Sequence, residues 1–499
     1  MRGELMPEYR ADRSQPFLLP PSLDDWVPAN HLVRFVDLFV DQLSDDTGPP
    51  WSGASAPSER GAWRYPPEVL GKLWLYGFMI GVRSTRGLER LARESIPARW
   101  LAANLTPDHN TLWRFYDRHR RLFSQLFHAT VRVAYDAELI DLRLMAVDGT
   151  RIRANAAGDR MRSAEQLEQL ALAVEARIAE VEAQGEADDA PPDELPPDWR
   201  QLIAKQKRIA AAQEQIATGR TKVNLTDPDA HQMTAKGINT PAYNAQAAVT
   251  GVVVEPGDDA RPGGRVIVGA AIRTRADDHG CLAEMIEQVT ETVGTQPAVT
   301  LADVGYSSGA ELAACAALGA TVVLPEKFEA RYDHPYGPRH FPYDPATDTM
   351  RCPEGTILKR WGRPGADVRY AAPMAACQAC PAKAACCPVT KRGRVIARSP
   401  DAVLVEQHRA WMEQPRAQAL ARRRSGLVEG VFGTIRMRHH ANQWLHRGRA
   451  AIADEWHLLT AAYNLRTLWR AWIGDFGPGV QQRLGIAGLA PLASQIART

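Results

Sequence analysis

The feature that most constrains the fold is the order of apolar segments between residues 142 and 325. Short runs rich in β-branched residues, which favour strands, alternate there with longer stretches whose apolar residues recur every three or four positions, which favour helices. The predicted order is strand, helical insertion, strand, strand, helix, strand, helix, strand. This order predicts a mixed α/β sheet rather than an all-α or all-β protein.

A helical hairpin interrupts this order at residues 164–218. Apolar residues repeat at three and four positions in its first half and at seven positions in its second half. Between the halves lies the acidic, Pro-rich stretch GEADDAPPDELPPD, which predicts a solvated tip. When this insertion is allowed for, the predicted order is that of an RNase H-like sheet.

The chain of 499 residues is too long for a single core and predicts about three domains. We expect an all-α N-terminal domain at residues 1–138, an RNase H-like α/β domain at 139–470 and a C-terminal tail at 471–499 that is loosely ordered. The α/β domain carries two insertions, the helical hairpin at 160–218 and a Cys-containing segment at 328–408.

No membrane contact is expected. The longest apolar stretches, such as residues 249–254, are too short to cross a bilayer. The first ten residues mix charges without an apolar core, unlike a signal peptide. These features predict a cytoplasmic protein.

Positive charge is concentrated in two regions, although the net charge is only +2. Residues 409–449 hold nine Arg and two acids, and residues 81–136 hold ten Arg and five acids, whereas residues 180–198 hold eight acids and no Lys or Arg. The planar guanidinium group can bind phosphate through two parallel hydrogen bonds. Contact with nucleic acid and an ordinary solvated surface are both consistent with this distribution.

One arginine-rich helix is predicted in the first domain. It begins after a cap at Asp108 and continues to Leu139. Its polar face carries Arg114, Arg118 and Arg121. Together with the short helix predicted at 85–94, it resembles a helix-turn-helix arrangement, and a helical bundle with solvated arginines fits equally well.

Two aspartates follow predicted strands. Asp148 ends the apolar run that begins at Leu144, and Asp303 ends the strand in LADVGYSS. Open α/β sheets place their functional residues at the carboxyl ends of strands. A hairpin turn at Asp148 and a helix cap at Asp303 are equally good local interpretations. Asp278 is predicted to cap the helix at 279–293.

Glu429 lies between valines on a helix that also carries several other apolar residues. We expect its side chain on the buried face of this helix. A carboxylate in that position is costly unless it is paired or bound to a metal ion. Glu429 is therefore predicted to be more than a surface acid.

The cysteines are unevenly spread. Five of the seven, Cys352, Cys377, Cys380, Cys386 and Cys387, fall within residues 352–387. An odd count in a chain without a secretion signal argues against a disulfide framework. Cys352, Cys377, Cys380 and Cys386 could bind one structural Zn²⁺, with Cys387 as an alternative fourth ligand, and reduced thiols on an irregular subdomain are the competing interpretation. Cys281 and Cys315 are predicted to be core residues.

The chain resembles the DDE transposases of bacterial insertion sequences, in the branch with an N-terminal helical domain and a Cys-containing insertion before the final Glu. LLPPSLDDWVPANHLVRFVD and TPDHNTLWRFYDRHR resemble the opening domain. MAVDGTRIRANA resembles the first-Asp motif, followed by YNAQAAV, and LADVGYSS resembles the second-Asp motif. VEGVFGTIRMR and DEWHLLTAAYNLRTL resemble the final-Glu helix and the helix after it. The resemblance covers residues 18–469.

The resemblance implies a catalytic triad of Asp148, Asp303 and Glu429 that holds two Mg²⁺ (or Mn²⁺) ions, with Asp148 shared between them. Tyr306 matches the aromatic residue after the second Asp. The family pattern places Tyr and Arg ahead of the Glu where this chain has Arg422 and Ser425, and Arg424 is the candidate substitute. The residues expected to neutralise DNA phosphates near the site are Arg422, Arg423, Arg424, Arg436 and Arg438.

The implied function is that of a DNA transposase. It would bind the terminal inverted repeats of a mobile element, cleave double-stranded DNA and join the 3′-OH ends to target DNA, as a homodimer on DNA. Two alternatives remain, an RNase H-like nuclease that does not join strands and a catalytically silent transposase-derived DNA-binding protein. Trp444 is expected in the core, with stacking on a flipped base as the alternative.

Overall fold

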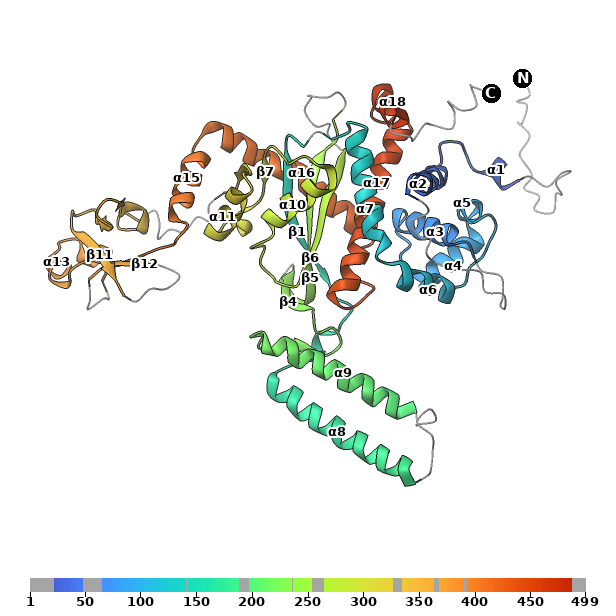
Figure 1. Cartoon of the computed structure of the whole chain (residues 1–499), viewed down its shortest axis with the longest axis horizontal. Coiled ribbons are helices and arrows are strands. Elements are labelled where there is room, and N and C mark those ends of the chain that lie inside the picture. Colours follow the sequence, from blue (N-terminus) through green and yellow to red (C-terminus); the bar gives the residue numbers. More distant parts are fainter. Residues whose placement is uncertain are drawn as a thin grey trace, which may run out of the picture. The chain divides into compact units, whose positions relative to one another are not determined.

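The computed structural model describes residues 22–47, 65–140, 142–187, 197–235, 237–253, 264–325, 334–362, 368–388 and 393–486 (Figure 1). Three sequence-based expectations fall outside these residues: the first part of the resemblance, at 18–21, most of the acidic tip, at 188–196, and the end of the tail, at 487–499.

The chain divides into two compact units. The first combines residues 1–122 with 469–499, and the second holds residues 123–468. This division reflects packing alone, so the functional domains expected at 1–138 and 139–470 remain predictions. Among the helices described in either unit, none has the length and apolar character required to cross a membrane.

The first unit is helical throughout its described part. Its helices are α1 (Leu23–Trp26), α2 (Leu32–Thr47), α3 (Pro67–Met79), α4 (Thr85–Glu94), α5 (Ile96–Leu101), α6 (His109–His119) and α18 (Pro478–Ile486). Trp74 of α3 is buried against Tyr116 of α6, with ring centroids 4.8 Å apart, and its indole N–H donates to the Leu112 carbonyl. Helix α18 lies in residues 471–499, the segment that the sequence predicted to be a loosely ordered tail.

The long helix expected from His109 to Leu139 is interrupted. Asp108 caps α6 as predicted, accepting the backbone N–H groups of Asn110 and Thr111. The helix ends at His119, however, and α7 begins at Leu122. α6 belongs to the first unit, and α7 belongs to the second from Phe123 onward.

A six-stranded mixed sheet forms the centre of the second unit. Its strands are β1 (Met145–Arg153), β4 (His231–Ala235), β5 (Ile238–Gly251), β6 (Arg265–Arg273), β7 (Thr300–Leu301) and β8 (Val322–Val323). β5 pairs antiparallel with β1, β4 and β6, whereas β7 is parallel to both β1 and β8. Apart from the small strands β2 to β4, the order of elements agrees with the order expected from the sequence.

Helices pack against this sheet. They are α7 (Leu122–Asp136), α10 (Leu282–Val293), α11 (Gly309–Ala317), α15 (Ala402–Met412), α16 (Pro415–Met437) and α17 (Arg449–Trp472). α7 and α17 lie side by side (Figure 1), and the Phe127 and His457 rings stack between them at 5.7 Å. Asn464 of α17 is buried and hydrogen-bonds both backbone groups of Ile267 in β6. These contacts fix α17 to the sheet.

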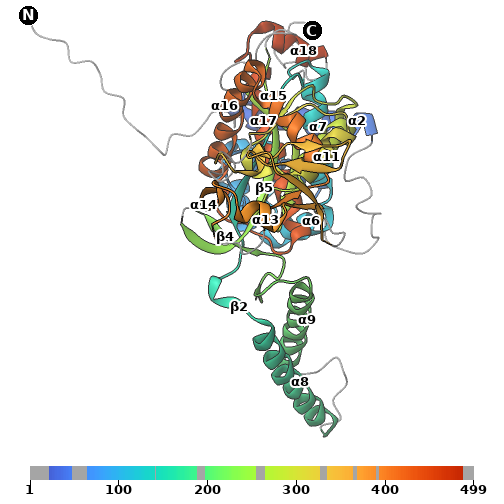
Figure 2. The ribbon, with the colours of Figure 1, turned by 90° about the vertical axis from the view of Figure 1, so that its left-hand side faces the viewer.

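The helical hairpin is confirmed. α8 (Ala164–Ala187) and α9 (Pro197–Ala217) run antiparallel from a short base formed by β2 (Met161–Arg162) and β3 (Val223–Asn224) (Figure 2). The predicted repeats produce its core. Leu167 contacts Ala212 near the base, and Val174 and Ile178 pack on Ile209 further along.

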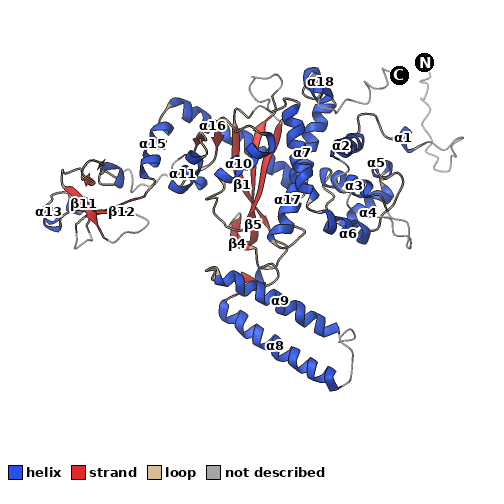
Figure 3. Cartoon of the chain, in the orientation of Figure 1, coloured by secondary structure: helices blue, strands red, loops and turns tan. Residues whose placement is uncertain are grey.

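The Cys-containing segment is more regular than expected. The described residues between 334 and 398, called the cysteine module below, form an antiparallel sheet in the order β13–β12–β11–β10–β9. Figure 3 labels two of its strands, β11 and β12. The strands are β9 (Tyr343–Asp344), β10 (Thr349–Arg351), β11 (Ile357–Trp361), β12 (Val368–Ala371) and β13 (Val395–Arg398), with helices α13 (Met374–Gln378) and α14 (Lys383–Cys386). Strands of two to five residues are too short to show a clear apolar period in the sequence.

Candidate active site

Asp148 lies inside a strand rather than at its end. β1 continues to Arg153, and Asp148 pairs with Ala247 of β5, so the hairpin turn considered from the sequence is wrong. The parallel pairing of β1 with β7 covers only Met145 and Ala146. Asp148 therefore lies two residues beyond the last residue of β1 that pairs with β7. On that side of β1, no described residue of β7 is paired with Asp148.

Arg424 of α16 forms an ion pair with Asp148. Its Nη1 atom donates to Asp148 Oδ2 over 2.9 Å, and both side chains are 22% exposed. Burial raises the pKa of Asp148, the Gly149 N–H and Arg424 counteract this increase, and the neighbouring charge of Asp303 adds to it. Asp148 and Asp303 are therefore close enough for their charges to interact.

Asp303 is both a strand-end residue and a cap. It follows β7 and caps the 3₁₀ turn at Val304–Tyr306, with Oδ1 accepting the Gly305 N–H over 2.8 Å. Tyr306 is fully buried, and burial raises the pKa of its phenol well above the usual value. The phenol stays protonated and donates to Gln246 Oε1. Both local interpretations of Asp303 are thus compatible.

Asp278 does not cap a helix. α10 begins at Leu282, and its first N–H groups are satisfied by Glu311 of α11, a buried carboxylate that accepts from Leu282 and Ala283. Asp278 instead accepts two side-chain amides through Oδ1, from Asn244 over 2.7 Å and from Gln246 over 2.6 Å. The sequence pattern missed this because the true cap comes from another helix.

Asp278 lies beside Asp303. A Cβ atom at Gly305 would lie 2.9 Å from Asp303 Oδ1 and 3.1 Å from Asp278 Oδ2. Both carboxylates therefore border the same small space above Gly305, where only a glycine fits without movement. Below, the centre means Asp148, Asp303 and Asp278 together with the side chains that hydrogen-bond to them.

Glu429 is exposed, in contrast to the buried position expected. The buried residues of this part of α16 are Leu427, Val428, Val431, Phe432 and Ile435. At 3.6 residues per turn, Glu429 lies about 130° from the centre of that face. The charged residue on the buried face is Arg424, one helical turn before Val428. The sequence correctly predicted a buried apolar face on this helix, but the charged residue on that face is Arg424 and not Glu429.

Contacts between α16 and β1 nevertheless occur on both sides of Glu429 in the sequence. Arg424 binds Asp148, and Arg436 donates to the Thr150 hydroxyl and to the Arg151 carbonyl. Glu429 lies between these two contacts, about two turns before Arg436 on the same side of the helix. No described contact joins Glu429 to Asp148 or Asp303. Within the described ranges, no three His, Cys, Asp or Glu side chains are already arranged to hold a metal ion.

The arginines expected to bind DNA occupy different settings. Arg424 and Arg436 are half-buried and bound to β1 as described above. The remaining members of the set are exposed: Arg422, Arg423 and Arg438 on or next to α16, and Arg114, Arg118 and Arg121 on or next to α6. Trp444 is 1% exposed and packs edge-on against Trp456, so it is a core residue rather than a base-stacking platform.

Two members of the centre were missed from the sequence, Asn244 and Gln246. They stand at alternate positions of β5, and alternate residues of a strand point to the same face. Both are buried, at 2% and 0% exposure, and three alanines lie between them or directly after them in the strand. A pair of amides at i and i+2 in the apolar run YNAQAAV was the available signal.

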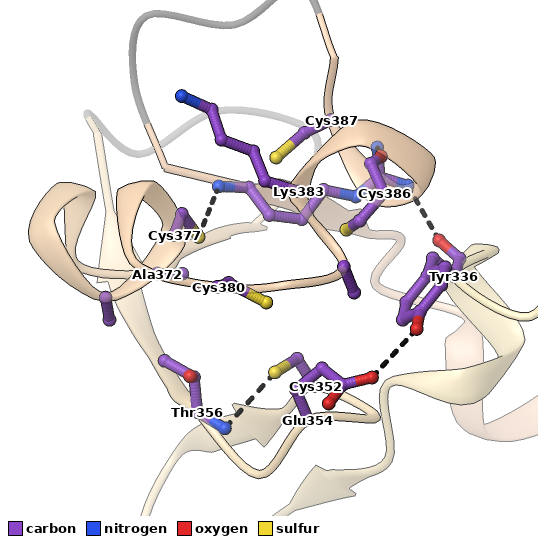
Figure 4. Close-up of a pocket in the computed structure, with 13 residues that line it drawn as sticks. Tyr336, Cys352, Glu354, Thr356, Ala372, Cys377, Cys380, Lys383, Cys386 and Cys387 are labelled. Atoms are coloured by element: carbon purple, nitrogen blue, oxygen red, sulfur yellow. Dashed lines mark hydrogen bonds between the residues drawn. The ribbon is translucent and has the colours of Figure 1, made fainter.

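The structure describes all seven cysteines. Cys281 and Cys315 are buried in the core of the second unit, as predicted. The five clustered cysteines line one pocket of the cysteine module (Figure 4). All seven lie in described parts of the chain, and none forms a disulfide.

Two family models match the chain. Residues 351–469 match a family described as "Transposase DDE domain", and residues 21–118 match one described as "Transposase domain (DUF772)". The first match contains Glu429 but neither Asp148 nor Asp303. No curated protein and no solved structure matches the chain.

Proposed function

We propose that this chain, which carries two transposase domains, is a DDE transposase that cleaves DNA at the ends of its mobile element and joins the 3′-OH ends to target DNA. The transposase domains indicate a DNA transposase that acts on DNA. The observation that supports the finer assignment best is the parallel register of β1 and β7: Ala146 pairs with Leu301, so Asp148 and Asp303 each follow two residues after the same pair.

The strand order supports an RNase H-like core. The path β6–β5–β1–β7–β8 has three antiparallel strands followed by two strands parallel to β1. Such a sheet brings the side chain beyond the end of β7 next to the side chain on β1. This juxtaposition supports the selection of Asp148 and Asp303 from the many acids of the chain.

The donor set suits a hard divalent cation. Mg²⁺ prefers carboxylate and water oxygens, and two like charges held close together favour binding of a cation between them. Asp148, Asp303 and Glu429 are the residues proposed to hold two such cations. When bound, two such ions would activate the attacking oxygen and stabilise the leaving oxygen of the phosphodiester.

The residues around the carboxylates have distinct proposed roles. Arg424 neutralises Asp148 in the unloaded chain and must release it before the carboxylate can coordinate a cation. Gln246 and Asn244 donate to Asp278, and Tyr306 orients Gln246 by donating to its amide oxygen, so that together they fix the wall beside Asp303. The exposed arginines of α16 would bind phosphates and orient the scissile strand.

The test is a cleavage and strand-transfer assay with the DNA that flanks the gene. Asp148→Asn, Asp303→Asn and Glu429→Gln should each reduce cleavage and joining by at least about 1000-fold, because metal ions contribute several kcal/mol to such reactions. Binding to the end DNA in a band-shift assay should change little, because phosphate contacts supply most of the affinity.

Glu182→Gln on α8 is the matched control, since it removes an exposed acid outside the centre and should leave all activities unchanged. Full cleavage by Glu429→Gln would contradict its role as a ligand. Cleavage without any joined product in the unaltered chain would favour a nuclease, and end binding without cleavage would favour a silent DNA-binding protein.

A further inference from the structure

The cysteine module has a very small core. Its buried cluster consists of six residues, Phe341, Met350, Leu358, Tyr370, Ala372 and Ile396. Chain segments of this size rarely bury enough apolar surface to hold a fixed fold, and disulfides or a structural metal commonly make up the difference. Disulfides are absent from the module's described residues. Its five cysteines are the remaining candidates for stabilisation.

The five cysteines gather from three separate segments. Cys352 follows β10, Cys377 and Cys380 belong to α13 and the turn after it, and Cys386 and Cys387 end α14. All of them line one pocket, and Figure 4 shows their side chains around the same space. In the sequence, only Cys377 and Cys380 of this proposed set form a C-x-x-C pair. The fold brings Cys352 to that pair from twenty-five residues earlier in the sequence.

Two of the sulfurs already accept backbone hydrogen bonds. The Thr356 N–H donates to Cys352 Sγ over 3.1 Å, and the Arg394 N–H donates to Cys377 Sγ over 3.4 Å. N–H groups directed at sulfur stabilise the thiolate form, which is the form that binds metal. Positive charge is also close, because Lys383 and Arg394 line the pocket. These groups offset the negative charge that four thiolates retain around a divalent ion.

Cys386 is the better fourth ligand of the two adjacent cysteines. Cys352, Cys377 and Cys386 pack against the same buried cluster. Arg394, which lines the same pocket, donates through its side chain to the Cys386 carbonyl. Cys386 therefore shares its position against the buried cluster with two of the other proposed ligands.

We propose that Cys352, Cys377, Cys380 and Cys386 bind one structural Zn²⁺ that holds the cysteine module together. In a tetrahedral site the metal–sulfur distances are about 2.3 Å. As no three potential ligands in the described chain are yet close enough to share a metal, the sulfurs must turn toward one another on binding. The proposal does not depend on the transposase function.

Elemental analysis of the full-length chain, purified without added metal or chelator, tests the site. The unaltered chain should contain about one zinc, and the Cys377→Ser/Cys380→Ser double variant should contain less than about 0.1. Cys386→Ser should also lose zinc, whereas Cys387→Ser, its adjacent control, should retain it. Cys315→Ala controls for loss of a remote buried thiol.

A second measurement avoids variants that fail to fold. Replacing zinc by Co²⁺ in the unaltered chain should give the intense visible absorption of tetrahedral cobalt and a sulfur-to-cobalt charge-transfer band. Removing the metal should increase proteolytic cleavage within residues 334–398 and leave the α8–α9 hairpin as resistant as before. An unaltered chain without zinc or a cobalt spectrum would overturn the proposal. Zinc lost from Cys387→Ser but not from Cys386→Ser would overturn the assignment of the fourth ligand.

Discussion

Replacing Gly149 by Ala should damage the centre without removing any of its side chains. Gly149 follows Asp148 in β1 and pairs with Gln246 of β5. An added Cβ would lie 2.3 Å from Gln246 Nε2 and 2.7 Å from Asn244 Oδ1. Ordinary contacts of this kind are about 3.5 Å, so the Gln246 amide must move by about 1 Å.

This movement would break hydrogen bonds that depend on the two amides. They donate to Asp278 Oδ1 over 2.7 and 2.6 Å, and a shift of about 1 Å takes a hydrogen bond beyond its useful range. Hydrogen bonds to a charged group contribute about 1.5–3 kcal/mol each, and overpacking of a full core costs about 1–3 kcal/mol. With partial relaxation, we expect Gly149→Ala to lower the free energy of unfolding by about 2–4 kcal/mol.

Urea unfolding followed by far-UV circular dichroism measures this change. Gly158→Ala is the control, since its Cβ would meet only Pro241 at 3.9 Å, and it should change stability by less than about 0.5 kcal/mol. Asp278→Ala removes the acceptor of the same bonds, so its effect should not add fully to that of Gly149→Ala. A Gly149→Ala chain as stable as the unaltered one, with full cleavage activity, would refute the described packing of the amides.

Three further predictions concern charge. Burial lowers the pKa of His457 to about 4; because the unfolded chain binds this proton below pH 6.5, stability should fall by about 3 kcal/mol between pH 6.5 and 4. His457→Leu should lack that portion of the acid sensitivity in urea titrations, and an unchanged pH profile would contradict it. Arg424→Gln removes the cation that competes for Asp148, so calorimetry should show Mn²⁺ binding about 10-fold tighter; weaker binding would contradict the competition. Arg438→Ala should weaken DNA-end binding and reduce its salt dependence by about one counterion, and an unchanged salt slope would exclude a phosphate contact.

Local patterns in the sequence predicted most of the fold. The alternation of strands and helices, the α8–α9 hairpin and the Asp108 cap are all present because each depends on residues near one another in the chain. The misassignments have a common cause. The cap of α10 comes from Glu311, and the short strands of the cysteine module gain their regularity from pairing. Such long-range interactions leave little trace in local periodicity.

The candidate site was predicted in part for the same reason. Asp148 and Asp303 follow apolar strand segments, a pattern that the sequence displays, and the structure brings their charges together. Asn244 and Gln246 act through Asp278, which only the folded sheet brings near. Glu429 shows the limit of a helical pattern, since it is next to the buried Val428 in the sequence but about 130° from the centre of the buried face around the helix.

Asp148, Asp303 and Glu429 are proposed to share a pair of metal ions. Anomalous scattering from Mn²⁺ in crystals of the chain bound to its end DNA measures this directly. We predict two manganese ions about 4 Å apart, with oxygens of all three carboxylates at about 2.0–2.3 Å from at least one of them. Manganese bound by Asp148, Asp303 and Asp278, with the Glu429 carboxylate more than about 10 Å away, would contradict the triad.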